Sequence, residues 1–137
     1  VEKDPRCIKT IEENLNHVGI KDVVVVDYGL SHRKIDPGKQ PQVTVIQADI
    51  FKALLHFNET KSRFGIIIAD PPYGTDHARK ILIKLAMYDI LKNPFIVVIE
   101  HSEKDKLPDK EGNIILLRQY NYGATVLSVY LKESGHE

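Results

Sequence analysis

The segment Asp70-Pro71-Pro72-Tyr73 places a carboxylate, a stiff turn and an aromatic ring next to one another. Proline lacks a backbone N–H and biases the residue before it toward extended conformations, so the turn is stiff and leaves carbonyl acceptors free. Asp70 adds an anionic acceptor, and Tyr73 adds a flat face with a polar tip. This combination suits a planar group that carries an NH2, such as a nucleobase. A Pro-rich turn with Asp70 as a local cap and Tyr73 as partial core explains the four residues equally well.

The strand that must position this tetrapeptide is the apolar run Ile66 to Ala69, which directly precedes it. An unbroken run of β-branched residues predicts a strand that is buried on both faces, as in a parallel sheet. Ligands of open α/β sheets bind beyond the carboxyl ends of the strands. The sequence therefore predicts that the chemistry takes place at Asp70 to Tyr73.

The remaining elements follow from periodicity and from helix and turn signals. An Asp4 cap, Pro5 and the face Ile8, Ile11, Leu15 and Val18 predict a helix that Gly19 ends. The other expected elements are strands at 23–26, 43–47, 95–99, 114–120 and 124–131, and helices at 51–57 and 76–92, the last one stopped by Asn93-Pro94. Residues 121–123 are too short to join parallel strands, so the last two strands form an antiparallel hairpin.

Composition limits the classes of protein to consider. A chain of 137 residues is expected to form one domain, over residues 1–137, and residues 27–42 are expected to be a loop or hairpin insertion, more simply solvated than in contact with RNA. The formal net charge is zero, so any nucleic-acid surface must be local. A single cysteine, Cys7, excludes an internal disulfide and suits a reducing cytoplasm. No apolar stretch is long enough to span a bilayer, so a cytoplasmic location without a membrane partner is expected.

The motifs together resemble those of S-adenosylmethionine-dependent methyltransferases that act on exocyclic amino groups of bases. The closer resemblance is to the bacterial small-subunit (16S) rRNA guanine-N2 methyltransferases of the RsmD type. It covers nearly the whole chain, through VEKD (1–4), QAD (47–49), DPPY (70–73), VIEHS (98–102) and YGAT (122–125). The resemblance implies an α/β fold of the Rossmann-like class I methyltransferase type, with a mostly parallel sheet that ends in an antiparallel hairpin.

The resemblance also implies which residues bind the cofactor S-adenosylmethionine. Glu2, at a strand-to-helix turn, is expected to hold the ribose, although a solvated surface acid would be the simpler reading without the family. Asp49 resembles the acid near the adenine amino group, and Ile50 is expected to contact the adenine ring. Asp49 is also a good N-cap for the helix that follows it, and both roles are compatible.

On the substrate side, the resemblance implies a guanine whose N2 is held by Asp70 and the Pro71 carbonyl in the turn that Pro72 completes. Tyr73 is expected to stack on the base through its ring face. His101, Ser102 and Tyr122 are expected to lie on the same side, with His101 approaching RNA phosphate and Tyr122 either shaping this side or packing its turn. No metal is needed. The partner is ribosomal RNA, either free or within a small-subunit assembly particle.

Two alternatives remain open at this point. The same chemistry could act on adenine N6 of DNA or RNA, because DPPY alone does not choose the base. The chain could also be a non-catalytic RNA-binding remnant of the fold. The glycine-rich loop of the family lies before the motif that opens this chain at Val1. We therefore expect a C-terminal portion of a methyltransferase domain that lacks the first strand and is inactive alone.

Overall fold

The computed structural model describes residues 1–21, 23–27 and 43–133, which form two compact units, Val1–His56 and Phe57–Glu137. The expectation of one domain over residues 1–137 stays a prediction. The expected insertion at 27–42 lies, from residue 28 onward, outside the described residues.

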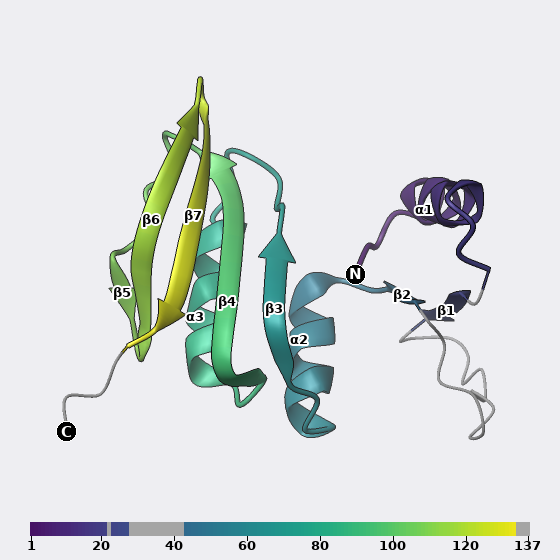
Figure 1. Ribbon diagram of the computed structural model, residues 1–137, viewed down its shortest axis with the longest axis horizontal. Coiled ribbons are helices and arrows are strands. Elements are labelled where there is room, and N and C mark those ends of the chain that lie inside the picture. The colour runs from purple at the N-terminus through teal and green to yellow at the C-terminus, as the bar shows by residue number, and fades with distance from the viewer. Residues whose placement is uncertain (22, 28–42, 134–137) are drawn as a thin grey trace. The chain divides into compact units, whose positions relative to one another are not determined.

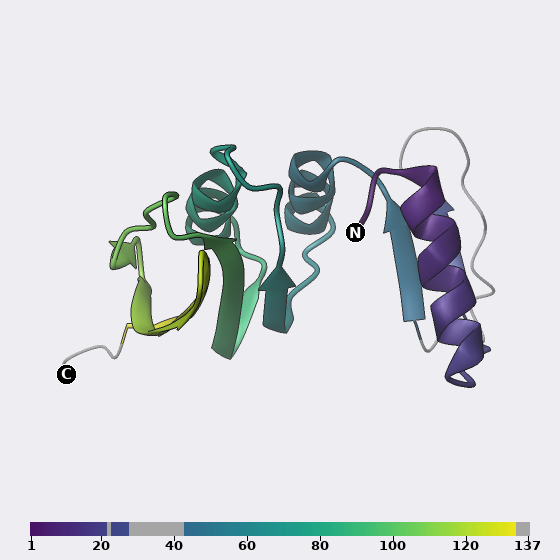
Figure 2. The ribbon, with the colours of Figure 1, turned by 90° about the horizontal axis from the view of Figure 1, so that it is seen from above.

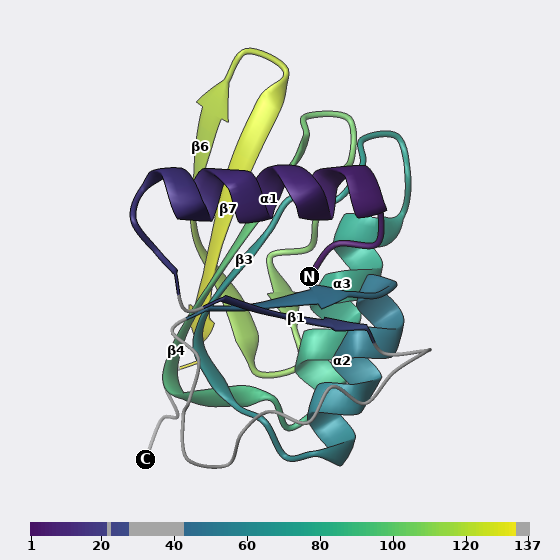
Figure 3. The same ribbon diagram turned by 90° about the vertical axis from the view of Figure 1, so that its right-hand side faces the viewer.

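The first unit contains helix α1, Pro5–His17, and the parallel strands β1, Val23–Asp27, and β2, Val43–Gln47. Asp4 caps α1 by accepting a hydrogen bond from the Arg6 N–H, and Gly19 follows the helix with φ +84°, a conformation that favours glycine. Figure 3 shows α1 lying across one face of the two strands. The expected cap and both strands are confirmed, but Val18 lies at the exposed C-cap and does not share the buried face of Ile8.

Helix α2, Ile50–Glu59, begins in the first unit, and its last residues belong to the second. The second unit is built on a five-stranded sheet whose order is β3-β4-β7-β6-β5. Its strands are β3 (Phe64–Ala69), β4 (Leu91–Ser102), β5 (Lys110–Glu111), β6 (Ile114–Tyr122) and β7 (Thr125–Lys132). Strands β3 and β4 are parallel and the other pairs are antiparallel, which confirms the predicted hairpin (Figure 1).

The core of the second unit lies between this sheet and helix α3, His77–Met87 (Figure 2). The residues buried there from α3 are Ala78, Ile81, Leu82 and Leu85, and those from the sheet include Phe95, Val97, Ile99 and Tyr130. Burial, helped by the charge of Asp109, raises the pKa of Tyr130 to about 12. The Tyr130 hydroxyl therefore stays protonated at neutral pH and donates to the Pro108 carbonyl at 2.9 Å.

The segment after α3 differs from the sequence prediction. The helix ends at Met87 instead of continuing to Lys92, and Asn93-Pro94 lies inside β4 instead of stopping a helix. The strand register explains how β4 contains this proline. Phe64 pairs with Leu91 whereas Ile66 pairs with Ile96, so β4 is irregular between these two pairs. An irregular stretch tolerates a proline that cannot donate to the ladder.

The burial of β3 also differs from the prediction. Ile66 and Ile68 are 68% and 76% exposed, so the strand is not buried on both faces in the described structure. Strand β3 is an edge strand of the second unit's sheet. Helix α3 covers one face of this sheet and leaves uncovered the face on which Ile66 and Ile68 lie (Figure 2). None of the helices in the described parts of the chain has the length and apolar character that crossing a membrane requires.

Candidate functional site

Tyr73 joins three segments that lie far apart in the sequence. Its hydroxyl donates to the Glu100 carboxylate at 2.9 Å and lies 2.8 Å from the Thr125 hydroxyl. Glu100 lies near the end of β4 and Thr125 at the start of β7, two neighbouring antiparallel strands. The DPPY turn, the EHS segment and the YGAT segment therefore meet at one edge of the sheet.

The turn at Asp70 leaves acceptors uncommitted beside this tyrosine. The exposed Asp70 carboxylate accepts no hydrogen bond from the described residues. The Pro71 carbonyl likewise accepts none among them, whereas the Pro72 carbonyl accepts one from the Thr75 hydroxyl at 2.8 Å. The turn thus offers the charged Asp70 carboxylate at its surface, whereas Pro71, whose carbonyl is the second acceptor, is a buried residue.

The loop at 103–109 is tied to the same turn. The Gly74 N–H donates to the Asp105 carboxylate at 3.3 Å, and Gly74 has φ +71°, which a side chain at this position would strain. The Glu103 N–H donates to the Ala124 carbonyl at 2.9 Å, in the turn between β6 and β7. The charged loop at 103–109 is therefore anchored at both the DPPY turn and the hairpin.

Electrostatics at the site keep Tyr73 protonated. The contact with Thr125 alone would lower the pKa of Tyr73, but the hydrogen bond to Glu100, desolvation and the charges of Glu100 and Asp70 outweigh it. The net effect raises the pKa of Tyr73 above its ordinary value. The hydroxyl therefore acts as a hydrogen-bond donor to Glu100, and this bond fixes the direction of the ring, which stays 46% exposed.

In the first unit, Glu2 lies beside β2 at its carboxyl end. The Glu2 N–H donates to the Ile46 carbonyl at 2.9 Å, and the Ala48 N–H donates to the Glu2 carbonyl at 3.0 Å. One oxygen of the Glu2 carboxylate accepts from the N–H groups of Lys3 and Asp4. The other oxygen has no hydrogen-bond donor within the described structure, so it can accept from a ligand.

Asp49, at the start of α2, likewise uses one carboxylate oxygen for backbone capping and leaves the other without a donor. Its Oδ1 accepts from the N–H of Phe51 at 2.9 Å and of Lys52 at 3.3 Å, which confirms its predicted capping role. Its Oδ2 has no donor among the described residues. Ile50 follows as the first, half-buried residue of α2. The first unit therefore brings Glu2, Asp49 and Ile50 to the carboxyl end of β2.

His101 lies in a different environment from the expected one. Its side chain is 3% exposed, so it does not reach a surface where RNA phosphate could contact it. Along β4, His101 alternates with Glu100 and Ser102, so it points to the face that α3 covers. Its Nδ1 lies 2.9 Å from the Ser102 carbonyl, and its Nε2 lies 2.7 Å from the Ser128 hydroxyl. The carbonyl can only accept, so Nδ1 carries a proton and donates to it; in the neutral ring Ser128 then donates to Nε2.

Replacing Ser128 with alanine should destabilise the protein by about 1–3 kcal/mol, because it leaves the buried Nε2 of His101 without a donor. Ser62→Ala, which removes a serine from a pair of surface hydroxyls, serves as the control and should change the free energy of unfolding by less than about 0.5 kcal/mol. Urea denaturation measures both values. Equal stability of the two variants would contradict the buried network.

The other two expected substrate-side residues are more accessible. Ser102 is half-buried, and its hydroxyl accepts from the Lys104 N–H at 3.2 Å, so it shapes the start of the 103–109 loop. Tyr122 lies at the end of β6, directly opposite Thr125. Glu100 and Thr125 were not singled out as site residues from the sequence, although both belong to motifs at strand ends that the sequence does reveal.

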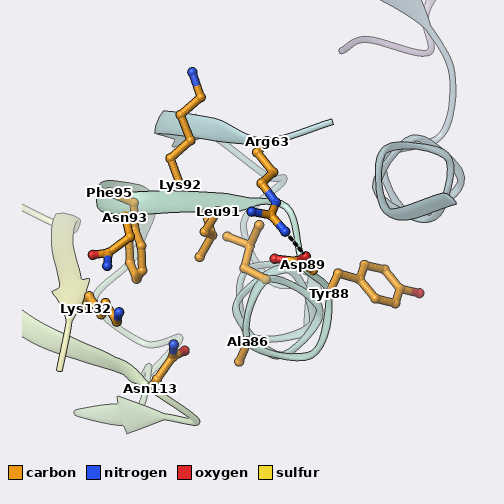
Figure 4. A pocket seen from close by; sticks show the side chains of 11 residues that line it. Arg63, Ala86, Tyr88, Asp89, Leu91, Lys92, Asn93, Phe95, Asn113 and Lys132 are labelled. Atoms are coloured by element: carbon orange, nitrogen blue, oxygen red, sulfur yellow. Dashed lines mark hydrogen bonds and ion pairs between the residues drawn. The ribbon is translucent and has the colours of Figure 1, made fainter. Parts of the chain in front are cut away.

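A separate pocket of about 280 Å³ lies at the other end of the second unit (Figure 4). It is lined by Arg63, Leu85, Ala86, Tyr88, Asp89, Leu91, Lys92, Asn93, Phe95, Asn113 and Lys132. Arg63 and Asp89 form an ion pair beside it. The pocket lies at the amino ends of β3 and β4, opposite the edge where ligands of such sheets bind, and we assign it no role. No cluster of three or more His, Cys, Asp or Glu that could hold a metal occurs within the described ranges.

The sequence of this chain is similar to a protein family and to individual proteins. A family model described as "Conserved hypothetical protein 95" matches residues 1–131. The Bacillus subtilis (strain 168) protein named "Putative rRNA methyltransferase YlbH" is 25% identical over 132 residues, which cover 96% of this chain and 61% of that relative. The chain thus spans less than two thirds of the length of this curated relative.

Solved structures show the fold. A "conserved hypothetical protein" from Streptococcus pyogenes has a TM-score of 0.75 at 19% identity, over 99% of this chain and 71% of that one. The "Putative methyltransferase yhhF" from Escherichia coli has a TM-score of 0.70 at 16% identity, over 98% and 63% of the two chains. The predicted Rossmann-like class I methyltransferase fold is confirmed.

Proposed function

Because the chain belongs to the "Conserved hypothetical protein 95" family, the RsmD-type methyltransferases, we propose that it transfers a methyl group from S-adenosylmethionine to the exocyclic N2 of a guanine in small-subunit ribosomal RNA. This family consists of methyltransferases, so membership supports a methyl-transfer activity. The proposal names four further features: N2 of guanine as the target atom, ribosomal RNA as the substrate, S-adenosylmethionine as the cofactor and the cytoplasm as the location. The similarity to a relative that is named an rRNA methyltransferase supports the choice of RNA.

The observation that carries the proposal is the hydrogen bonding of Tyr73 to Glu100 and Thr125. These bonds hold an exposed aromatic ring next to the uncommitted acceptors of Asp70 and the Pro71 carbonyl. A base that stacks on the ring can direct its amino group toward those acceptors. A turn that only closed a strand would not require a hydroxyl bridge to two further strands.

The residues of the first unit fit the proposed cofactor. Glu2 and Asp49 each use one carboxylate oxygen to cap their own backbone and keep the other oxygen for a donor. A ribose presents hydroxyl donors, and an adenine presents an amino donor, so both match carboxylate acceptors at strand ends. Ile50 supplies an apolar side chain for contact with the adenine ring. S-adenosylmethionine, when bound, supplies an electrophilic methyl group.

The residues of the DPPY turn then prepare the base. Asp70 and the Pro71 carbonyl accept hydrogen bonds from the two N–H groups of N2. Holding both N–H bonds toward acceptors favours a geometry in which the nitrogen lone pair is less delocalised into the ring. The Asp70 carboxylate also stabilises the positive charge that develops on this nitrogen. Tyr73 orients the base, and most of the rate enhancement comes from this positioning.

The test is the incubation of the full-length protein, as its gene encodes it, with methyl-labelled S-adenosylmethionine and unmodified ribosomal RNA, followed by analysis of the labelled nucleosides. We expect the label in N2-methylguanosine. Label in N6-methyladenosine would show that the chemistry is right and the base is wrong. Binding of RNA without any labelled nucleoside, from free RNA or from assembly particles, would identify a non-catalytic module and overturn the proposal.

A further inference from the structure

The β6–β7 hairpin carries exposed aromatic residues on the same sheet face as the candidate site. Arg118, Tyr120 and Tyr122 pair with Val129, Leu127 and Thr125 of β7, respectively. Directly paired residues of antiparallel strands point to the same face. The three β7 partners alternate along their strand with Val126 and Ser128, which are buried on the side of α3. The three side chains of β6 therefore lie on the face opposite α3.

Tyr73 belongs to this face as well. Its hydroxyl bonds Glu100 and Thr125, and the register pairs Glu100 with Leu127, which in turn pairs with Tyr120. Tyr122 lies directly opposite Thr125, so its Cβ is about 5 Å from that of Thr125. We call Tyr73, Tyr122 and Tyr120 the tyrosine platform.

The outer two rings of the platform are open to solvent. Tyr122 is 63% exposed and Tyr120 is 42% exposed, and the Arg118 guanidinium lies over the Tyr120 ring, 5.5 Å from its centre. Figure 1 shows that the β6–β7 hairpin reaches past the end of β4, so its tip projects from the sheet. The Cα atoms of residues two apart on a strand are about 6.6 Å apart, so Tyr120 and Tyr122 start from separate positions on the same face and each can serve one base.

We propose that the tyrosine platform binds the single-stranded nucleotides next to the target base, with Tyr122 and Tyr120 each stacking on one flanking base. Aromatic side chains on an open sheet surface, joined by an arginine, are a recurring way to hold unpaired RNA. The exposed Lys104 lies in the loop that the Glu103–Ala124 hydrogen bond ties to the hairpin, where it can contact a phosphate. This proposal rests on the proposed function, because Tyr73 is the ring assigned to the target guanine.

The test uses the full-length protein and a fluorescein-labelled five-nucleotide RNA with a central guanine and uridine flanks. A second probe has the same length but lacks the flanking bases. Fluorescence anisotropy at fixed salt gives both dissociation constants. Tyr122→Ala and Tyr120→Ala should each weaken binding of the first probe by about fivefold or more, and should leave the second probe within twofold. Tyr122→Phe and Tyr120→Phe should bind both probes like the unmodified protein.

Tyr88→Ala is the matched control, because Tyr88 also lies beneath a cation, that of Lys84, but at the end of α3 away from the site. It should leave the affinity for both probes unchanged. Melting temperatures check the fold of each variant, and Tyr122, the more exposed ring, decides the test if Tyr120→Ala is destabilised. Alanine variants that bind the first probe like the unmodified protein would overturn the platform and favour another use of this face, such as protein contact.

The same preparations separate this proposal from the proposed function. If the unmodified protein methylates guanine but the two alanine variants keep full RNA affinity, only the platform is wrong. If the alanine variants lose affinity for the first probe but the unmodified protein transfers no methyl group, the platform is supported as an RNA surface and the proposed reaction is wrong.

Discussion

Replacing Asp70 with asparagine is expected to lower methyl transfer by about 100-fold or more while leaving cofactor affinity within a few-fold. In the proposed mechanism the carboxylate stabilises charge that develops only in the transition state. Asparagine keeps an acceptor oxygen but removes the negative charge, and loss of one such electrostatic interaction has an effect of this size. The asparagine keeps the shape of the side chain, and Asp70 is exposed, so the fold should not change. Single-turnover methyl transfer to RNA measures the effect.

Asp109→Asn is the control for this variant. Asp109 is an exposed carboxylate in the same unit that the proposed mechanism does not use. Its removal should leave the rate within twofold. An Asp70→Asn protein that turns over at a near-normal rate would exclude the proposed role of this carboxylate.

Replacing Tyr73 with alanine is expected to lower productive capture of RNA by about 5- to 150-fold, the range for loss of one base–aromatic stack. The residues that we propose to bind the cofactor, Glu2 and Asp49, belong to the other unit, so cofactor affinity should stay unchanged. Rates at limiting RNA, together with calorimetric cofactor binding, measure the two effects on one preparation.

Tyr73→Phe distinguishes the ring from the hydroxyl. The sequence alone predicts that a ring face is enough, but the structure adds two hydrogen-bond partners that orient the ring. Each such bond contributes about 0.5–1.5 kcal/mol and acts on RNA capture only through the direction of the ring, so we expect a measurable loss that stays smaller than that of Tyr73→Ala. Glu100→Gln, which keeps an acceptor for the hydroxyl, should lose less. If Tyr73→Ala lowered the melting temperature and impaired cofactor and RNA together, Tyr73 would be a core residue instead.

Local signals predicted much of the fold correctly. Asp4 and Pro5 start α1 because one caps the helix and the other fits its first turn, and Asp49 caps α2 for the same reason. The hairpin follows from a connection too short for parallel strands. These features depend on residues close in sequence, so no tertiary contact had to be known.

The errors involve residues whose role depends on distant partners. Asn93-Pro94 signals a helix stop, but its strand tolerates a proline only because the pairing with β3 is irregular there. His101 lies between Glu100 and Ser102 in its motif but points to the opposite face of the strand. The apolar residues Val97 and Ile99, at alternate positions before it, indicate that this face is buried. The bridge from Tyr73 to Glu100 and Thr125 needs the β4–β7 register, which no local pattern contains.

The most direct test of the central claim is to map methylated nucleotides in ribosomal RNA from cells with and without the gene. We predict that one N2-methylguanosine in the small-subunit RNA disappears when the gene is deleted and returns when the intact gene, but not the Asp70→Asn version, is restored. An unchanged set of methylated guanines in the deletion strain would contradict the account.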